Sequence, residues 1–183
     1  MAQQVLFIHS AGPQGEQQGS SGLLQYLKKE LGTDYQVIAP DMPEPEDPKY
    51  REWREVLKEE LAAVEDGSVL VGHSIGGSAL LKFLSEEELG KSFSKVITIA
   101  APFWGLDEDW QLEDFQLADD FSTRNALLPD VVLLHSIEDD IVPFSHLQKY
   151  MENLPSATVK QLPGNDHIFQ DGLSEAADEI RKM

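Results

Sequence analysis

The chain has 183 residues, of which 41% are hydrophobic and 26% are charged. This length suits one compact domain, and this balance is typical of globular rather than disordered chains. Thirty-three acidic residues against 14 basic residues give a formal net charge of -19, which disfavours nucleic acid and anionic membrane surfaces as partners. We therefore expect a single globular domain over residues 1–183 with an acidic, solvated surface.

The sequence contains no cysteine, which excludes disulfides and thiolate metal sites. Residues 1–8 lack the basic segment of a secretory signal, and their apolar run is far shorter than the roughly 18 residues of a membrane span. The five histidines show no spacing typical of metal ligands. We expect a cytoplasmic protein that uses neither a metal nor another cofactor.

Short apolar, β-branched runs bounded by Gly, Pro, Asp or Ser recur along the chain and predict strands. Stretches with apolar residues at helical spacing lie between them. Strands are expected at 5–8, 35–39, 68–71, 96–100, 131–134 and 158–160, and helices at 23–31, 53–64, 79–84, 147–154 and 173–180. This alternation predicts a three-layer α/β/α sandwich around a mostly parallel, doubly wound sheet, with the functional site in the loops that follow strands.

Two segments interrupt the alternation: a proline-rich loop over 40–48 and an aromatic, acidic stretch over 101–130. The second has a pattern compatible with a helix over about 109–125, and it is too short to form a large cap domain, so we expect an open cleft. Phe103 and Trp104 follow a strand end, and they are candidates for a pocket that holds the substrate. The alternative is that these aromatic side chains belong to the local core.

A nucleophile elbow is predicted directly after the strand that ends at Val71. The sequence Gly-His-Ser-Ile-Gly-Gly over 72–77 follows this strand and precedes a helical pattern, which is the context that a G-x-S-x-G motif requires. Such a turn exposes the hydroxyl of Ser74 at a helix N-terminus, and the N–H of Ile75 is a candidate oxyanion donor. The alternative is a glycine-rich turn that only joins a strand to a helix.

A serine nucleophile needs a base, and the base needs an acid that fixes its tautomer. With such an elbow the expected chain order is Ser, then acid, then His. Carboxylates at Glu138, Asp139 and Asp140 follow the strand at 131–134, and His167 lies in the loop after the next strand. The residues alone also allow these aspartates to form only a turn or a helix cap.

The two loops resemble the pattern of α/β-hydrolases, in which a strand followed by H-G-x-x-D-x-x-V-P precedes G-x-G-H-F near the C-terminus. The chain is most similar to the small serine hydrolases of the retinoblastoma-binding protein 9 and YdeN type, which share its length and have no inserted cap. Alignment on Val142 and Pro143 implies that the family's acid falls on Asp139 rather than Asp140, and that its histidine falls on His167.

The chain departs from the family pattern at three positions. Ser136 and Asp166 stand where many relatives carry a small residue, and Asp140 stands where proline is common. The last departure leaves two adjacent carboxylates as candidates for the acid, with Asp139 preferred.

The other histidines are expected to be structural. His9 closes the first strand in a loop that resembles the family's His-Gly loop, which implies a second oxyanion donor from the N–H of Ala11. The side chain of His9 is expected to brace this loop. His73 is expected beneath the elbow, His135 ends a strand, and His146 is expected on a surface helix without a role.

These residues predict a serine hydrolase of the carboxylesterase type, in which Ser74, His167 and Asp139 cleave a small acyl substrate through an acyl-enzyme. Short-chain esters are the first expectation, and amides, peptides and thioesters stay open. The alternatives are an acyltransferase or thioesterase with the same triad, or an inactive hydrolase fold that binds proteins, although no protein partner is indicated. An epoxide or haloalkane hydrolase is disfavoured, since those relatives carry aspartate at the elbow.

Overall fold

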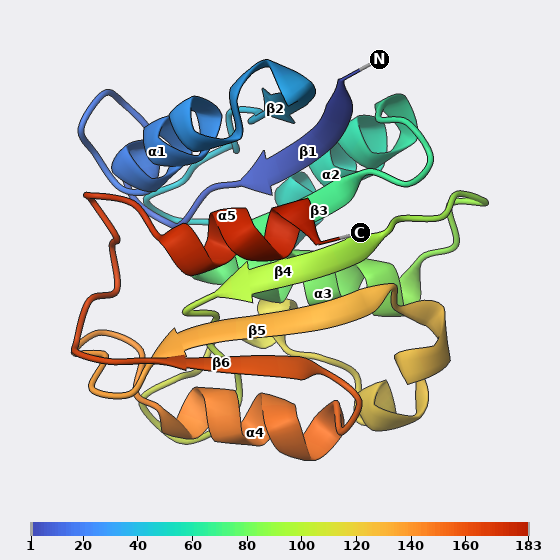
Figure 1. The fold of residues 1–183 in the computed structure, drawn as a ribbon. Coiled ribbons are helices and arrows are strands. Elements are labelled where there is room, and N and C mark those ends of the chain that lie inside the picture. Colours follow the sequence, from blue (N-terminus) through green and yellow to red (C-terminus); the bar gives the residue numbers. More distant parts are fainter. Residues whose placement is uncertain (1, 183) are drawn as a thin grey trace.

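A computed structural model describes residues 2–182, which form one six-stranded parallel sheet covered by helices (Figure 1). Neighbouring strands follow the order β2-β1-β3-β4-β5-β6, and every pair in this order is parallel. The strands are β1 (Gln3–Ile8), β2 (Tyr35–Ile38), β3 (Val69–His73), β4 (Lys95–Ile99), β5 (Asp130–Ser136) and β6 (Thr158–Leu162). Each predicted strand overlaps one of these.

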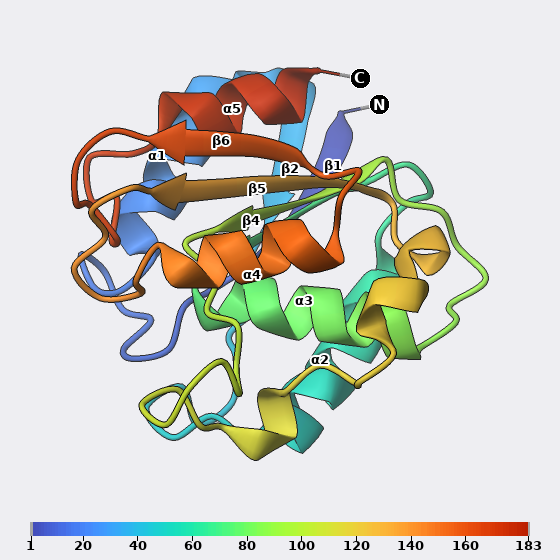
Figure 2. The same cartoon turned by 90° about the horizontal axis from the view of Figure 1, so that it is seen from below.

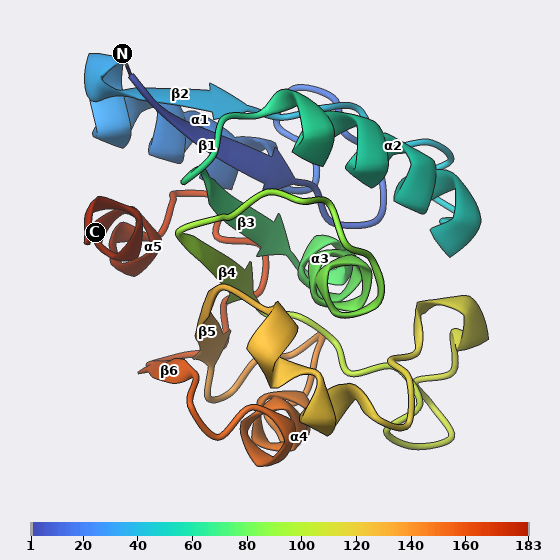
Figure 3. The ribbon, with the colours of Figure 1, turned by 90° about the vertical axis from the view of Figure 1, so that its right-hand side faces the viewer.

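Five α-helices cover the two faces of the sheet, which Figure 3 shows close to edge-on. Helices α1 and α5 lie on one face, and α2, α3 and α4 lie on the other (Figure 2). The helices are α1 (Ser21–Leu31), α2 (Tyr50–Ala63), α3 (Ile75–Glu86), α4 (Ser145–Asn153) and α5 (Ser174–Arg181). The predicted three-layer α/β/α fold is confirmed, and the described residues hold no cap domain.

Both faces of the central strands are buried, which explains their nearly continuous apolar sequences. In β1, Leu6 and Ile8 pack into the core cluster beneath α2, α3 and α4, whereas Val5 and Phe7 pack into the cluster beneath α1 and α5. Complete burial of a side chain of this kind contributes about 1.5–3 kcal/mol, before the entropy cost of ordering it. The sheet is therefore a rigid base for the loops at its carboxyl edge.

The strand order reverses between β1 and β3, and this reversal sets the place of a site. Strand β1 leads to α1 on one face, while its neighbour β3 leads to α3 on the other face (Figure 3). The loops that leave these two strands diverge and open a crevice at their carboxyl ends, where open α/β sheets bind ligands.

The helix considered over 109–125 does not form, and that prediction was wrong. The segment instead holds three short 3-10 turns at Glu113–Phe115, Phe121–Thr123 and Asn125–Leu127. Phe115 and Phe121 both enter the same core cluster. These two phenylalanines are therefore buried from two separate 3-10 turns rather than from one face of a helix.

No helix among residues 2–182 combines the length and the apolar character needed to cross a membrane.

Candidate active site

Ser74 stands at a strained turn between β3 and α3. Its backbone has φ 53° and ψ −124°, a conformation that non-glycine residues rarely adopt. The N–H of Ser74 donates to the carbonyl of Ile99 at 2.8 Å, so the end of β4 holds the turn in place. The strained conformation is therefore fixed by the sheet beneath it.

Two glycines make this turn sterically possible. A Cβ at Gly72 would lie 2.5 Å from the backbone nitrogen of Gly77, and a Cβ at Gly76 would lie 2.5 Å from the carbonyl oxygens of Ile8 and His9. Both distances are far below van der Waals contact. The backbone of α3 thus approaches β3 and the end of β1 more closely than any side chain would allow.

The structure brings Ser74, His167 and Asp139 together from three separate loops. Nδ1 of His167 lies 2.9 Å from Oδ2 of Asp139, and Nε2 of His167 lies 3.2 Å from Oγ of Ser74. Since a carboxylate only accepts, Nδ1 carries the proton and donates a hydrogen bond to Asp139. In neutral His167, Nε2 is therefore free to accept the hydroxyl proton of Ser74.

Asp139, and not its neighbours, meets the histidine. Its Oδ1 accepts from the N–H of Ile141 at 2.9 Å and from that of Val142 at 2.8 Å. Burial opposes ionisation of Asp139, but the hydrogen bonds from His167 and from these two amides outweigh it, so the pKa of this carboxyl is lowered. Asp140 and Glu138 are exposed. Asp139 thus forms the turn that its type favours and also holds His167.

Two departures from the family pattern secure the loop of His167. Oγ of Ser136 donates to the carbonyl of Asp166, and Oδ1 of Asp166 accepts from the N–H of Phe169 at 2.8 Å. Phe169 adopts φ 52°, which such a side-chain contact helps to maintain. Ser136 and Asp166 therefore fix the backbone on both sides of His167.

His146 is the residue that sequence reasoning misjudged. It is completely buried on the inner face of α4, rather than exposed on a surface helix. Its Nδ1 accepts from the N–H of Phe103 at 2.9 Å, and its ring packs edge to face on Trp110 at 4.6 Å. Burial lowers the pKa of His146 to about 4, so it is neutral. The helical spacing of His146 and buried Tyr150, one turn apart, was the signal that places it inward.

The remaining histidines are buried near the site. His135 donates from Nε2 to the carbonyl of Val142 at 2.8 Å, and the same atom lies 3.6 Å from Oδ2 of Asp139, beyond hydrogen-bond distance. The ring of His9 packs edge to face on Phe7 at 5.4 Å. Burial lowers the pKa of both His135 and His9, which keeps them uncharged beside the site.

The two candidate oxyanion donors are the N–H groups of Ile75 and Ala11, and within the described part of the chain they lack the backbone partner that the N–H of Gly12 has. Ile75 is the first residue of α3, so its N–H has no partner within the helix. Ala11 follows β1, and no hydrogen bond of its N–H occurs among residues 2–182, whereas the N–H of Gly12 donates to the carbonyl of Pro45 at 2.7 Å. Ile75 and Ala11 therefore keep free donors on the two loops that border the crevice.

Phe103 and Trp104 are half-buried and pack on the core cluster beneath α2, α3 and α4. The ring of Phe103 meets that of Tyr150 edge to face at 5.0 Å, and the ring of Trp104 lies 5.5 Å from that of Trp110. Both residues thus have partners in the local core as well as partly exposed surface after β4. Their role in substrate binding stays a prediction.

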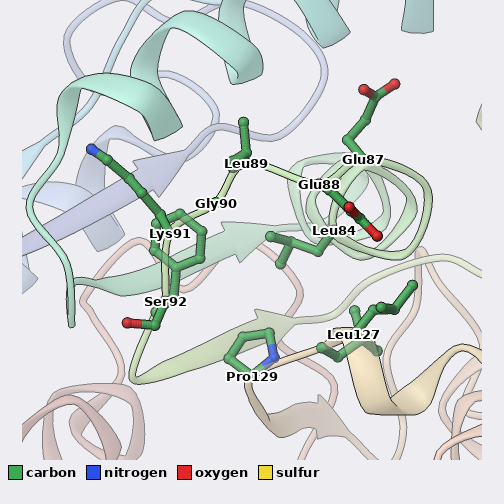
Figure 4. Close-up of a pocket in the computed structure, with 11 residues that line it drawn as sticks. Leu84, Glu87, Glu88, Leu89, Gly90, Lys91, Ser92, Leu127 and Pro129 are labelled. Carbon is green, nitrogen blue, oxygen red and sulfur yellow. The ribbon is translucent and has the colours of Figure 1, made fainter.

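A cavity of about 420 Å³ lies away from this site (Figure 4). It is bounded by the last turn of α3, the 87–93 loop and residues 127–129, and its walls include Leu84, Lys91 and Pro129. Leu84 is nine residues along α3 from Ile75, which is about 14 Å at 1.5 Å per residue. This cavity therefore adjoins the amino ends of β4 and β5, opposite the edge that holds Ser74.

No group of three residues suited to binding a metal ion occurs among residues 2–182.

The class is an α/β-hydrolase: a six-stranded parallel sheet carries a strained serine elbow after β3 and an Asp–His pair on the loops after β5 and β6. Residues 20–179 match the model of the serine hydrolase family, and the chain belongs to this family.

Named relatives agree. The protein YdeN of Bacillus subtilis (strain 168), named as a hydrolase, is 25% identical over 176 residues, which cover 95% of this chain and 90% of YdeN. The crystal structure of the B. subtilis ydeN gene product matches with a TM-score of 0.82 and 23% identity over 98% of this chain and 97% of that chain. The 2-hydroxy-6-oxo-6-phenylhexa-2,4-dienoate hydrolase of Rhodococcus sp. strain RHA1 matches with a TM-score of 0.73 and 16% identity, over 98% and 89%. The expected resemblance to hydrolases of the YdeN type is confirmed. At 23% and 16% identity, the two solved structures support the fold of this chain and no more.

Proposed function

We propose that this serine hydrolase cleaves small carboxylic esters through an acyl-enzyme on Ser74, with His167 as base and Asp139 as the acid that orients it. The observation that carries the proposal is the continuous contact from Asp139 through His167 to Ser74, at 2.9 Å and 3.2 Å. Each member comes from a different loop, so their meeting requires the whole fold.

The geometry supports a two-step reaction. Nε2 of His167 takes the proton of Ser74 as Oγ attacks the ester carbonyl, and then gives it to the departing alcohol. Water, activated by the same nitrogen, attacks the acyl-enzyme and releases the acid. Throughout, the ionised carboxylate of Asp139 stabilises the imidazolium that forms twice in each cycle.

Two backbone amides hold the oxyanion in this proposal. The N–H of Ile75 lies at the N-terminus of α3, where the helix dipole favours a developing negative charge. The N–H of Ala11 lies on the opposite wall of the crevice, after β1. A backbone donor of this kind contributes roughly a hundredfold to a thousandfold in kcat.

The substrate class follows from the open surroundings of the site. The segment between β4 and β5 contributes only three 3-10 turns to the described structure, so no cap covers the carboxyl edge of the sheet. Phe103 and Trp104 offer an apolar wall next to the elbow for a short acyl or alcohol group. We infer that this site binds a small-molecule acyl substrate. Esters are the favoured class, because their carbonyl carbon needs little activation for attack by Ser74.

The proposal is tested with a fluorophosphonate, which phosphonylates an activated serine and releases fluoride. The intact mass of the purified protein is read with and without the reagent, beside p-nitrophenyl acetate hydrolysis. We expect one adduct on the wild type and none on Ser74→Ala, and we expect His167→Ala to lower kcat by about ten-thousand-fold or more.

The outcomes separate the alternatives. A folded wild type that takes no adduct and cleaves no ester contradicts the proposal and favours a non-catalytic binding role. An adduct together with transfer of the acetyl group to an added alcohol, in preference to water, assigns an acyltransferase instead.

A further inference from the structure

A buried hydrogen-bond chain joins the loop after β1 to the loop of His167. Oγ of Ser20 contacts Nδ1 of His73 at 2.8 Å, and Nε2 of His73 contacts the carbonyl of His167 at 2.7 Å. At the other end, the N–H and the hydroxyl of Ser10 contact Oγ of Ser20 at 2.8 Å and 2.9 Å. Ser20 is 1% exposed and His73 is 0% exposed, so water does not compete for these contacts.

The direction of this chain follows from the chemistry of its members. The carbonyl of His167 only accepts, so Nε2 of His73 carries a proton. Burial lowers the pKa of His73 to about 3, which keeps the ring neutral and leaves Nδ1 as an acceptor. The single hydroxyl proton of Ser20 therefore goes to Nδ1, and the hydroxyl of Ser10 is the donor to Ser20. All hydrogen bonds of the chain are therefore donated in one direction, from Ser10 through Ser20 and His73 to the carbonyl of His167.

The hydroxyl of Ser20 takes part in this hydrogen-bond chain and does not cap helix α1. Ser20 occupies the N-cap position of α1, where serine usually accepts from the first helical amides, yet it makes no such side-chain bond. A missing cap of this kind costs about 1 kcal/mol of helix stability. With one donated and two accepted hydrogen bonds, its hydroxyl is saturated inside the chain instead.

Both ends of the chain lie next to groups that the proposed reaction uses. The N–H of Ser10 is fixed by Ser20, and this amide is one residue before the candidate oxyanion donor of Ala11. The other end fixes the backbone of His167 itself, while the ring of His73 lies 5.5 Å, centre to centre, from the ring of His167. The chain therefore spans from the oxyanion loop, residues 9–12, to the proposed base.

We propose that Ser20 and His73 are positioning residues, which hold the oxyanion loop and His167 at a fixed separation across the elbow. This inference rests on the proposed function, since it concerns the same site. Neither residue contacts Ser74 or Asp139 by a hydrogen bond within residues 2–182, so they act through Ser10 and His167. Displacement of a reacting group by about 1 Å can lower a rate about a hundredfold.

The test compares His73→Leu, His73→Gln and Ser20→Ala with the wild type. Leucine removes both hydrogen bonds of His73, whereas glutamine supplies an amide donor and a carbonyl acceptor. Ser85→Ala is the matched control, because Ser85 is a buried serine on α3 whose hydroxyl bonds only the carbonyl of Lys82, at 2.9 Å. The readouts are kcat and KM for p-nitrophenyl acetate, and the rate of fluorophosphonate labelling.

We expect His73→Leu and Ser20→Ala to lower kcat and the labelling rate by about 10- to 100-fold with KM within about twofold, because neither residue touches substrate. His73→Gln should stay within about fivefold of the wild type, and Ser85→Ala should equal it. In ¹⁵N-histidine NMR spectra, His73 should be neutral with its proton on Nε2. A proton on Nδ1 would reverse the chain and overturn the inference.

The outcomes distinguish this inference from the function on which it rests. If the wild type is labelled, and His73→Leu and Ser20→Ala are labelled at the same rate as the wild type, only the positioning role is overturned. A folded wild type without labelling overturns the proposed function, and the inference with it. If His73→Leu does not fold, the other two variants decide. A reduced labelling rate for Ser20→Ala, with a labelling rate near that of the wild type for His73→Gln, supports the inference. Wild-type labelling rates for both variants reject it.

Discussion

The two oxygens of Asp139 have different partners: Oδ2 accepts a hydrogen bond from Nδ1 of His167 at 2.9 Å, while Oδ1 accepts one from the N–H of Val142 at 2.8 Å. The backbone of the β5–α4 loop therefore fixes the carboxylate, and the carboxylate in turn fixes the imidazole. The orientation of His167 is thus tied to the turn from Asp139 to Val142. Loss of the charge and loss of the turn are separable changes, which mutations can distinguish.

Replacement of Asp139 by asparagine should abolish most activity while preserving the turn. The amide oxygen can still accept from Val142, but the amide nitrogen then faces His167 and donates to Nδ1. Nε2 would carry the proton of neutral His167 and could not accept from Ser74. We expect kcat for p-nitrophenyl acetate to fall by about a thousandfold to ten-thousandfold, measured at steady state.

Asp140→Asn is the matched control for this substitution. Asp140 is the adjacent residue and is exposed, so its replacement should change kcat by less than about threefold. Thermal unfolding of both variants checks that neither has lost the fold. If Asp140→Asn has a lower kcat than Asp139→Asn, then Asp140 and not Asp139 is the acid that orients His167.

The stability of the protein should decline on mild acidification because His73 is buried in its neutral form. Its pKa is lowered to about 3, whereas the unfolded chain takes up this proton near 6.5. Between these values the unfolded chain binds more protons, so the free energy of unfolding decreases as the pH falls. One such histidine contributes about 1.4 kcal/mol per pH unit in this range, or about 2 kcal/mol between pH 7 and pH 5.

The variant His73→Gln isolates this contribution. It has no titrating group at position 73, so its free energy of unfolding should fall by about 2 kcal/mol less than that of the wild type between pH 7 and pH 5. Urea unfolding at the two pH values gives the difference. His146, whose pKa is lowered to about 4, contributes in both proteins and cancels. Equal pH dependence of the two proteins would mean that burial does not lower the pKa of His73 in the folded protein.

Gly76→Ala should be more damaging than Gly77→Ala, although the two residues are adjacent on α3. The new Cβ at Gly76 would lie 2.5 Å from the backbone oxygens of Ile8 and His9, which cannot rotate away. At Gly77 the nearest atoms, the Cβ of Ala101 and the oxygen of Gly72, lie at 3.0 Å. We expect losses of about 3 kcal/mol and about 1 kcal/mol.

Thermal unfolding measures this contrast, since 1 kcal/mol corresponds to about 2–4 °C in Tm for a chain of this size. Gly76→Ala should also lower kcat, because the displaced carbonyls of Ile8 and His9 lie at the end of β1 and the start of the loop that carries Ala11. A Gly76→Ala protein as stable as Gly77→Ala would mean that β1 and α3 are packed less closely than the 2.5 Å distances at Gly76 imply.

The parallel sheet and the three candidate catalytic residues were predictable because their signals are local. Buried parallel strands read as apolar runs, and the elbow needs glycine at fixed offsets around Ser74. The preference for Asp139 over Asp140 came from alignment on Val142 and Pro143, and the structure gives its physical reason: Oδ1 of Asp139 accepts the amide of Val142. The Asp–His contact itself joins loops that only the strand order brings together.

What the sequence could not reveal depends on tertiary partners. Serine before a helix predicts a cap, and nothing local shows that the hydroxyl of Ser20 turns instead to His73. Likewise, a histidine near the start of a helix is compatible with solvent, and only the packing of α4 on the sheet buries His146. Nor did the local pattern after Trp110 reveal that the chain forms short 3-10 turns there, with Phe115 and Phe121 buried against residues of other elements.

His146 itself provides the last test, because its hydrogen bond and its ring packing can be removed separately. Phenylalanine at this position keeps an aromatic ring against Trp110 but leaves the buried N–H of Phe103 without an acceptor. Loss of one such partner costs about 1–3 kcal/mol. Asparagine keeps an acceptor near the place of Nδ1 and loses the ring.

We therefore expect His146→Phe to lower the free energy of unfolding with little change in tryptophan fluorescence, and His146→Asn to shift the fluorescence through the altered surroundings of Trp110. Urea titrations and emission spectra of the two variants give both quantities. Since Phe103 belongs to the candidate substrate wall, the loss of its amide contact should also raise KM for esters while kcat stays close to that of the wild type. A His146→Phe protein with unchanged stability and KM would return this histidine to the inert role that the sequence suggested.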